Sequence, residues 1–574
     1  MPFRSIDPKS MRRLLTTAAL CLIPGITAAP PARSAETIYF DYGFLGRSLP
    51  TSSLEAFVAD GTVDAELAPY LAGLSPASQQ ELQVLLSTPL SSLSSELPEQ
   101  VNDPFAISQW LYSPIGDLML ATTGQLIQTQ GRRNGQQALR SAISLAAADP
   151  AGLSLINLIR FYPTGGVRLN LPQIVAVAEA INTNIETTDW LVNAAIQGSE
   201  AAAANDPALD YSALPMLAET GQLAVEERSL LLQDRERNRT YPVDLYLPAD
   251  LSAIAGPVPV LILSHGYGDT HTHPEITAAA RSLAANGFFV AAPEHIGSNK
   301  AYQDDLALGL THESFEALEF INRPLDIRFL LNTLEQQNDT EFQGRLQLDR
   351  VGLIGHSFGG YTALMAAGAT VDINRLQQQC DPETAFAPDN VNIALLIQCR
   401  LLELEASPQV IQQLTDGSLA DERVGLVITF APLSNLFGEQ GMGQIQVPTV
   451  IMGGAYDIAT PIVLEQLTAF QWLTTSEKYF YLAENLSHTT ELTRAVLDLV
   501  YPRGNVVESF NETEQWLFNL TVTLVIAHGH RYLLGNEAYR PYLTSAYVET
   551  VSVEPTKLHL LRSSSQLLEL DTQR

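Results

Sequence analysis

The chain has 574 residues, of which 46% are hydrophobic and 17% are charged, and its formal net charge is −31. This composition supplies a large buried core and excludes a disordered chain. Because so acidic a surface repels phosphate groups, it also argues against nucleic-acid binding. The length predicts more than one domain.

The first 35 residues have the pattern of an export signal. Basic residues up to Arg13 precede an apolar run from Leu14 to Ala29, and small residues follow the run. That order is typical of a signal peptide, so we expect residues 1–35 to be removed and the protein to be periplasmic or secreted. A retained anchor is the alternative, but the run is short for a membrane span, and no later stretch is long and apolar enough to cross a bilayer.

Two cysteines lie beyond this signal, Cys380 and Cys399, 19 residues apart. In an exported protein such a pair favours a disulfide, and two buried thiols are the alternative. Neither cysteine has a nearby histidine or a C-x-x-C spacing. We therefore expect a structural role for the pair.

Residues 36–200 are predicted to form a mainly helical accessory domain of unknown function. Apolar residues recur there at helical spacing, as at Leu54, Phe57 and Val58. The expected helices span 105–129, 134–147, 151–160 and 172–197. No cluster with metal-ligand spacing and no glycine-rich phosphate loop is found in this segment. Residues 198–207 are interpreted as a linker.

From residue 215 to about 540, short apolar segments alternate with helical ones. The expected strands span 222–233, 240–247, 258–263, 288–292, 351–354, 424–430, 448–452 and 478–482, and the expected helices span 276–286, 312–337, 361–369 and 511–534. This alternation predicts an α/β fold, a doubly wound and mostly parallel sheet with helices on both faces. Its site lies at the carboxyl ends of the strands. Residues 541–574 are interpreted as a C-terminal tail.

The segment Gly355-His-Ser-Phe-Gly359 follows one of the apolar strands and precedes a helix. Strand, tight turn and helix are the context in which G-x-S-x-G is a nucleophile elbow. A side chain at Gly355 or Gly359 would collide with the neighbouring strand or helix, which is why the pattern demands glycine there. Ser357 is therefore the candidate nucleophile.

Two further residues with catalytic chemistry follow later strands, Asp457 and then His488. The order Ser, Asp, His along the chain is that of the α/β-hydrolases. Asp457 is expected to orient His488, which would act as general base for the serine. The alternative for Asp457 is a helix N-cap near Thr460, and both roles are compatible.

Two other acids, Glu484 and Asp326, are rivals for Asp457. Asp326 precedes the nucleophile in the chain and lies within an expected helix. We expect Asp326 to pair with Arg323 or Arg328 instead of with the catalytic histidine.

The segment His265-Gly-Tyr267 follows another strand and is expected to form the oxyanion loop. Gly266 lets the backbone turn, and the N–H groups of Tyr267 and Phe358 are the expected donors. His265 is expected to brace the loop. His271 and His273 have the spacing of a metal pair, but the sequence offers no third ligand, so no metal and no organic cofactor is expected.

Four segments together resemble the platelet-activating-factor acetylhydrolase branch of the α/β-hydrolases and the bacterial predicted dienelactone hydrolases. They are 263–267, 291–295, 322–327 and 355–360, and the resemblance covers about 215–540. The resemblance implies a triad of Ser357, Asp457 and His488 that hydrolyses carboxylic esters. It also implies a role in lipid degradation. True dienelactone hydrolases use cysteine as the nucleophile, so that activity is not expected here. Residues 36–165 resemble an uncharacterised helical domain that precedes such hydrolases in cyanobacterial exported proteins.

Residues 371–423 form an insertion between the helix after the elbow and the next strand. The insertion contains both cysteines, and we interpret it as a lid, which means that substrate identity does not transfer from the family. The expected function is an exported serine esterase that acts on a small-molecule ester through an acyl-enzyme. The alternatives are a prolyl-oligopeptidase-like peptidase, a lipase or polyester hydrolase, and a non-catalytic cell-envelope binding protein.

Overall fold

The computed structural model describes residues 34–42, 45–89, 103–381, 384, 391–494, 506–563 and 566. The predicted signal peptide lies almost wholly outside the described residues. The chain forms two compact units, residues 1–90 with 123–171 and residues 91–122 with 172–574. None of the helices in the described ranges combines the length and apolar character that a membrane crossing requires.

The first unit contains a four-stranded sheet in addition to its helices. Its strands are β1 (Thr37–Tyr42), β2 (Leu45–Pro50), β3 (Ile127–Thr129) and β4 (Gly166–Asn170), in the order β2-β1-β4-β3. Its helices are α2 (Thr51–Asp60), α3 (Ala68–Leu71), α4 (Pro76–Ser87), α7 (Gln136–Ala148) and α8 (Leu155–Arg160). The mainly helical prediction missed this sheet because β1 pairs with β4, a strand far along the chain.

The single helix predicted over 105–129 is interrupted. The structure has α5 (Pro104–Leu111), α6 (Pro114–Leu126) and then strand β3. The break falls just before Pro114, because proline disfavours helical backbone in the residue that precedes it. Ser113 Oγ accepts a hydrogen bond from the N–H of Gly116 at 3.2 Å at the start of the second helix.

The second unit is built on a nine-stranded sheet in the order β13-β12-β11-β10-β9-β7-β8-β6-β5. The strands are β5 (Val225–Asp234), β6 (Arg239–Pro248), β7 (Val258–Ser264), β8 (Phe289–Pro293), β9 (Leu346–His356), β10 (Val424–Phe430), β11 (Thr449–Gly454), β12 (Lys478–Ala483) and β13 (Leu558–Leu561). Neighbouring strands pair in parallel along the part of the sheet made of β8, β7, β9, β10, β11 and β12. The pairs β5–β6, β6–β8 and β12–β13 are antiparallel.

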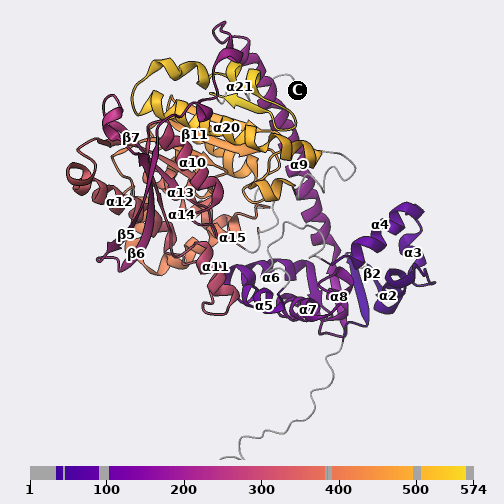
Figure 1. Ribbon diagram of the computed structural model, residues 1–574. Coiled ribbons are helices and arrows are strands. Elements are labelled where there is room, and N and C mark those ends of the chain that lie inside the picture. Colours follow the sequence, from indigo (N-terminus) through magenta and orange to yellow (C-terminus); the bar gives the residue numbers. More distant parts are fainter. Residues whose placement is uncertain are drawn as a thin grey trace, which may run out of the picture. The chain divides into compact units, whose positions relative to one another are not determined.

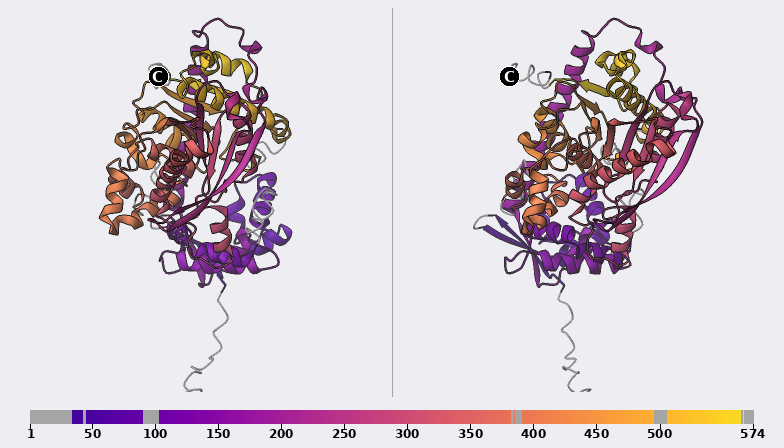
Figure 2. Two further views of the ribbon diagram at one scale, coloured as in Figure 1. Left: turned by 60° about the vertical axis from the view of Figure 1, so that its left-hand side comes forward. Right: turned by 90° about the vertical axis from the view of Figure 1, so that its left-hand side faces the viewer.

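Helices cover both faces of this sheet, as Figures 1 and 2 show. The α-helices are α9 (Leu171–Ala203), α10 (Pro274–Ala285), α11 (Lys300–Ala307), α12 (Glu319–Glu341), α13 (Phe358–Ala366), α17 (Gly438–Met442), α18 (Thr468–Trp472), α20 (Val506–Tyr532) and α21 (Ser545–Val551). Short turns of helix lie at η3 (Tyr211–Ala213), η4 (Leu217–Glu219), η5 (Leu251–Ala253), η8 (Asn435–Phe437), η9 (Ile462–Leu467) and η10 (Glu537–Leu543).

Successive residues of each strand point to opposite faces and enter two separate cores. In β9, Val351 and Leu353 belong to the core beneath α12 and α13, whereas Ile354 belongs to the core beneath α10 and α20. A sheet buried on both faces explains why its central strands are continuous apolar runs. The predicted α/β class with a large, mostly parallel sheet is therefore confirmed.

Two predicted boundaries differ from the structure. Residues 198–203, predicted as linker, continue helix α9, because alanine is the best helix former. Residues 545–561, predicted as part of a tail, form α21 and the edge strand β13. The two segments meet at Ser199, whose Oγ accepts the N–H of Leu560 at 2.9 Å and donates to Glu549 Oε1 at 2.6 Å.

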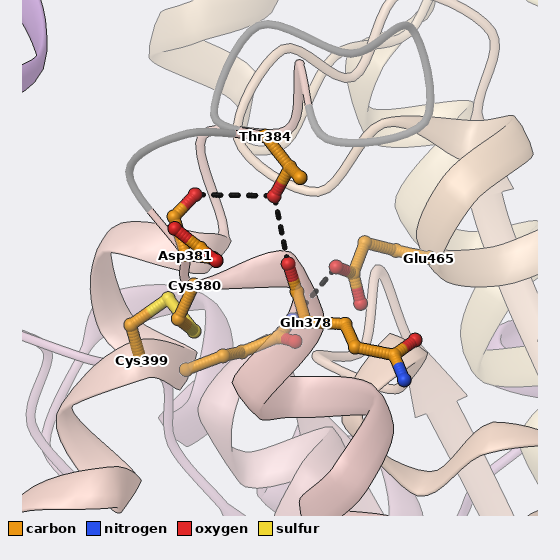
Figure 3. The surroundings of a disulfide bond; sticks show 7 residues. Gln378, Cys380, Asp381, Thr384, Cys399 and Glu465 are labelled. Atoms are coloured by element: carbon orange, nitrogen blue, oxygen red, sulfur yellow. Dashed lines mark hydrogen bonds between the residues drawn. A yellow bond between two sulfur atoms is a disulfide. The ribbon is translucent and has the colours of Figure 1, made fainter.

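The described part of the insertion over 371–423 is helical. It contains α14 (Ile373–Gln379), α15 (Leu395–Gln398), η7 (Cys399–Ala406) and α16 (Pro408–Thr415). The pair that the sequence offers for a disulfide, Cys380 and Cys399, is bonded. Figure 3 shows this disulfide with the labelled residues around it.

Candidate active site

Ser357 lies at a sharp turn between β9 and α13, with φ 55° and ψ −115°. Few non-glycine residues adopt such backbone angles, and the surrounding structure must hold them. The Ser357 N–H donates to Phe430 O at 2.8 Å. A Cβ at Gly355 would overlap the carbonyl of Gly359, and a Cβ at Gly359 would overlap the carbonyl of Ser264. Close backbone approach on both sides therefore requires the two glycines of the elbow.

Asp457 and His488 lie on the loops that follow β11 and β12, and they form a direct pair. His488 Nδ1 lies 2.9 Å from Asp457 Oδ2. Asp457 Oδ1 accepts the N–H groups of Ala459 at 2.9 Å and Thr460 at 2.8 Å. The capping role and the contact with the histidine coexist, and the capping hydrogen bonds fix the orientation of the carboxylate.

His488 is brought to the elbow through the neighbouring His356. The two imidazole rings lie 4.7 Å apart, and His356 Nε2 lies 3.0 Å from the carbonyl of His488. Burial, together with the nearby His488, lowers the pKa of His356 to about 3. His356 is therefore neutral, and its Nε2–H donates to the His488 carbonyl, which orders the loop that carries the histidine.

Among the described residues, Ser357 Oγ has no hydrogen-bond partner. The contact between nucleophile and base is often long in an enzyme without substrate and tightens when substrate binds. The structure thus brings Ser357, Asp457 and His488 to the carboxyl ends of β9, β11 and β12.

The predicted oxyanion loop lies directly against the nucleophile. A Cβ at Gly266 would lie 3.5 Å from Ser357 Cβ and 3.1 Å from His356 Nδ1. Within the described chain, the N–H of Tyr267 has no hydrogen-bond acceptor. The N–H of Phe358 opens helix α13, where the first amides have no acceptor within the helix. Both expected donors are therefore free to bind an anion beside Ser357.

His265 is fully buried and holds the oxyanion loop by two backbone contacts. Its Nδ1 lies 2.8 Å from Gly266 O, and its Nε2 accepts the N–H of His295 at 2.9 Å. Burial, with the positive charge of Arg323 nearby, lowers the pKa of His265 well below its ordinary value. The ring is therefore neutral with its proton on Nδ1, in the geometry of a brace for the loop.

Arg323, which the sequence analysis did not assign to the site, lies beneath this loop. Its guanidinium donates to His265 O at 2.7 Å and to Gly266 O at 3.2 Å. It also lies 4.3 Å from the centre of the Phe358 ring. Arg323 thus contacts Gly266, which directly precedes the proposed donor Tyr267, and the side chain of Phe358, whose N–H is the other proposed donor. Its place in the segment 322–327 was the only sequence signal that could have found it.

The predicted partners of Asp326 were wrong. Asp326 Oδ2 pairs with Arg239 at 2.8 Å, and Asp326 Oδ1 pairs with Arg237 at 2.8 Å. Both arginines lie on the β5–β6 hairpin or at its turn, so the pairing depends on the tertiary structure. The other rival acid, Glu484, pairs with His559 of β13 at 2.6 Å.

His271 and His273 have separate structural contacts. His271 Nδ1 lies 2.5 Å from Glu294 Oε2, and His273 Nδ1 accepts the N–H of Glu275 at the start of α10. In the part of the chain that the structure describes, no group of three or more His, Cys, Asp or Glu side chains is arranged to hold a metal ion.

The sheet order, its two helical layers and the elbow together define the α/β-hydrolase fold. Residues 34–170 match the family described as "Alpha/beta hydrolase of unknown function (DUF1400)", and residues 235–372 match the family described as "Putative esterase". No curated protein matches the chain. The fold and the two matches support the α/β-hydrolase superfamily and a hydrolase. The second match contains both the predicted oxyanion loop and Ser357.

Proposed function

We propose that the protein is an exported serine hydrolase that cleaves carboxylic esters. The observation that carries the proposal is the strained backbone of Ser357, at the same edge of the sheet as the pair of Asp457 and His488. A strained serine costs free energy and persists where function needs its hydroxyl at the tip of a turn. The match to an esterase family over residues 235–372 supports ester substrates.

In the proposed mechanism, Ser357 Oγ attacks the ester carbonyl while His488 Nε2 accepts its proton. Asp457 holds Nδ1 of the same ring and stabilises the imidazolium that forms. The N–H groups of Tyr267 and Phe358 bind the oxyanion. His488 then donates the proton to the leaving alcohol, and water releases the acyl group in a second, equivalent step.

The disulfide supports the proposed export. Disulfides persist in oxidising compartments such as the periplasm or the extracellular space and are rare in the bacterial cytosol. Cys380 and Cys399 are bonded.

Hydrolysis of p-nitrophenyl esters from acetate to palmitate tests the proposal, with residues 36–574 compared with the Ser357→Ala variant. We expect turnover by the parent and a loss of about 10⁴-fold or more in kcat in the variant. A rate that falls with acyl length would identify a short-chain esterase. Labelling of the parent by a fluorophosphonate provides a second measurement. Turnover in Ser357→Ala close to that of the parent, or a parent inert to both reagents, would contradict the proposal.

A further inference from the structure

Three consecutive residues of the insertion, Gln398, Cys399 and Arg400, contact residues that support the site on two sides. Cys399 is bonded to Cys380, so the disulfide holds the segment to helix α14. Gln398 and Arg400 are buried, with 0% and 3% of their surfaces exposed. Long polar side chains are rarely buried to this extent unless their polar groups are paired.

Gln398 binds Glu465, a fully buried carboxylate on η9. Glu465 Oε1 accepts Gln398 Nε2 at 2.7 Å and Asn392 Nδ2 at 2.5 Å, so both donors come from the insertion. Figure 3 shows Glu465 near the disulfide, with a hydrogen bond reaching its carboxylate. Because four donors face its two oxygens, the side chain is bound as an acceptor on every side.

The other oxygen of Glu465 holds the loop that follows β10. Glu465 Oε2 accepts the N–H of Ser434 at 2.7 Å and of Asn435 at 2.8 Å. The residue before them, Leu433, donates its N–H to the carbonyl of Ser357 at 3.2 Å. Glu465 therefore connects the insertion to a loop that contacts the backbone of the nucleophile.

The next residue on η9 reaches the acid. Gln466 Nε2 donates to Asp457 Oδ2 at 3.1 Å and to Thr460 O at 2.7 Å. Asp457 Oδ2 is also the oxygen that pairs with His488. Glu465 fixes the position of η9. That position affects Asp457 through Gln466, and it affects the backbone of Ser357 through the loop that begins at Leu433.

Arg400 acts on the oxyanion side of the site. It donates to Phe315 O at 2.7 Å, and its guanidinium lies 4.7 Å from the centre of the Phe315 ring. The Phe315 ring packs edge-on against Tyr267 at 5.5 Å and against Phe358 at 5.8 Å. These two residues carry the proposed oxyanion donors.

We propose that the disulfide-held segment 398–400 positions the catalytic groups, with Glu465 and Arg400 as the positioning residues. The proposal rests on the function proposed above and assigns the insertion a role beyond selecting substrates by size. Loosening a cover that only selects by size would leave turnover of the smallest ester unchanged. Loosening a positioning element would instead lower kcat on every ester, because small displacements of catalytic groups raise the barrier.

The test measures kcat and KM on p-nitrophenyl acetate, the smallest ester of the series, for three variants of the full exported chain. They are Glu465→Gln, Arg400→Met and the double variant Cys380→Ser with Cys399→Ser. In Glu465→Gln, an NH₂ group replaces one of the two oxygens that accept hydrogen bonds. This group cannot accept from the N–H donors that face it. We expect each variant to lose about 10- to 100-fold in kcat with KM changed less than about threefold.

Gln377→Ala is the matched control. Gln377 lies in α14 of the same insertion, and its exposed side chain contacts Glu405 without touching the segment 398–400 or η9. We expect kinetics equal to those of the parent. Parent-like kcat on the acetate ester in all three test variants, while long esters become faster, would overturn the proposal in favour of a size filter.

Amide hydrogen exchange of residues 430–436 and 457–467 gives a readout that needs no turnover and also guards against a variant that misfolds. It is measured on the native parent before and after reduction of the disulfide. Faster exchange in both segments on reduction, with the β9 and β11 strands unchanged, supports the proposal. Unchanged exchange in both segments refutes it, whether or not the parent hydrolyses any ester.

Discussion

At the scale of single residues, the site depends on backbone groups that approach too closely for side chains. The turn at Ser357 is held by two close approaches of backbone. Gly355 lies against the carbonyl of Gly359 in the first turn of helix α13, and Gly359 lies against the carbonyl of Ser264 at the end of β7. Beneath the proposed oxyanion loop, the buried guanidinium of Arg323 donates to the carbonyl of His265 and adds a second donor to the carbonyl of Gly266, which also accepts from His265 Nδ1. Buried polar groups without partners are costly, so these contacts stabilise one loop conformation.

Replacing Gly359 by alanine should destabilise the second unit. The new Cβ would overlap the carbonyl of Ser264, and overpacked positions cost about 1–3 kcal/mol. The free energy of unfolding, measured with urea, should therefore fall by up to about 3 kcal/mol, and activity should be lost. Gly256→Ala is the control, since its φ is +85° and no atom lies within 4 Å of the new Cβ. That variant should lose only about 1 kcal/mol. Equal losses in the two variants would contradict the explanation.

Replacing Arg323 by lysine should reduce turnover more than binding. Arg323 also donates to Ser298 Oγ at 2.8 Å. The compact ammonium group of a lysine cannot span His265 O, Gly266 O and Ser298 Oγ as the planar guanidinium does. We expect kcat on p-nitrophenyl acetate to fall about tenfold or more, because the oxyanion donors are less well held. Arg328→Lys, on the same helix, should behave like the parent, since Arg328 contacts the carbonyls of Ser418 and Ala420 instead. A parent-like kcat in Arg323→Lys would show that the loop holds itself.

At the scale of elements, the edge strand β13 is fixed to the sheet by a buried histidine between two acids. His559 Nε2 lies 2.6 Å from Glu484 Oε1, and His559 Nδ1 lies 2.8 Å from Glu549 Oε1. Glu484 follows β12 and Glu549 lies in α21, so the contact joins three elements. Although burial opposes the charge, the hydrogen bonds from the ring to both carboxylates raise the pKa of His559 to about 9.

This pKa predicts a loss of stability at alkaline pH. The folded-state pKa lies above the ordinary value of 6.5, so the stabilisation is complete below about pH 6.5 and lost as the pH rises through about 9. The slope approaches about 1.4 kcal/mol per pH unit at most. Melting temperatures of the parent and of His559→Gln should therefore differ most near pH 6 and converge by pH 10. A constant difference from pH 6 to pH 10 would argue against a charged His559, and the exposed His312→Gln serves as control.

At the scale of the whole molecule, we expect the net charge of −31 to affect how fast charged substrates reach the proposed site. A strongly negative surface repels anionic substrates, and salt screens this repulsion because the Debye length shortens from about 30 Å at 0.01 M to about 8 Å at 0.15 M. The charge acts on the encounter with substrate, whereas the proposed triad would act on the chemical step.

The charge therefore predicts a salt effect that depends on the substrate. For an anionic ester such as p-nitrophenyl hemisuccinate, kcat/KM should rise by about threefold or more between 0.01 M and 0.15 M salt. For the neutral p-nitrophenyl acetate it should change little. An equal response of both esters would show that salt acts on the enzyme itself and not on the encounter.

Much of the second unit and of the candidate site was predictable from local sequence. The central strands are short apolar runs because both faces of the sheet are buried, and the glycines mark the elbow because no side chain fits there. Ser357, Asp457 and His488 each follow one of the parallel strands, β9, β11 and β12, and parallel strands present their carboxyl ends at one edge of the sheet. The disulfide partners were the only two cysteines beyond the predicted signal.

Two boundary errors, at Pro114 and at residues 198–203, are local, whereas the other failures share one physical cause, which is that the partner lies far away along the chain. Strand β13 has four residues and pairs with β12 about 80 residues earlier, so no local pattern marks it. The helical spacing of Asp326 and Arg323 suggested a pair, but the β5–β6 hairpin brings Arg239 and Arg237 to that carboxylate.

The residue types that suit the proposed chemistry, their order and the alternation of strands and helices are therefore evident in the linear chain. They depend on local sterics and on burial, and both leave a local pattern of residue types. Folding, in contrast, sets which charged groups pair, which backbone carbonyls Arg323 holds, and how Glu465 connects the insertion to the loops around Ser357 and Asp457. Such contacts form between segments that folding brings together, because buried polar groups must find partners wherever the packed elements place them.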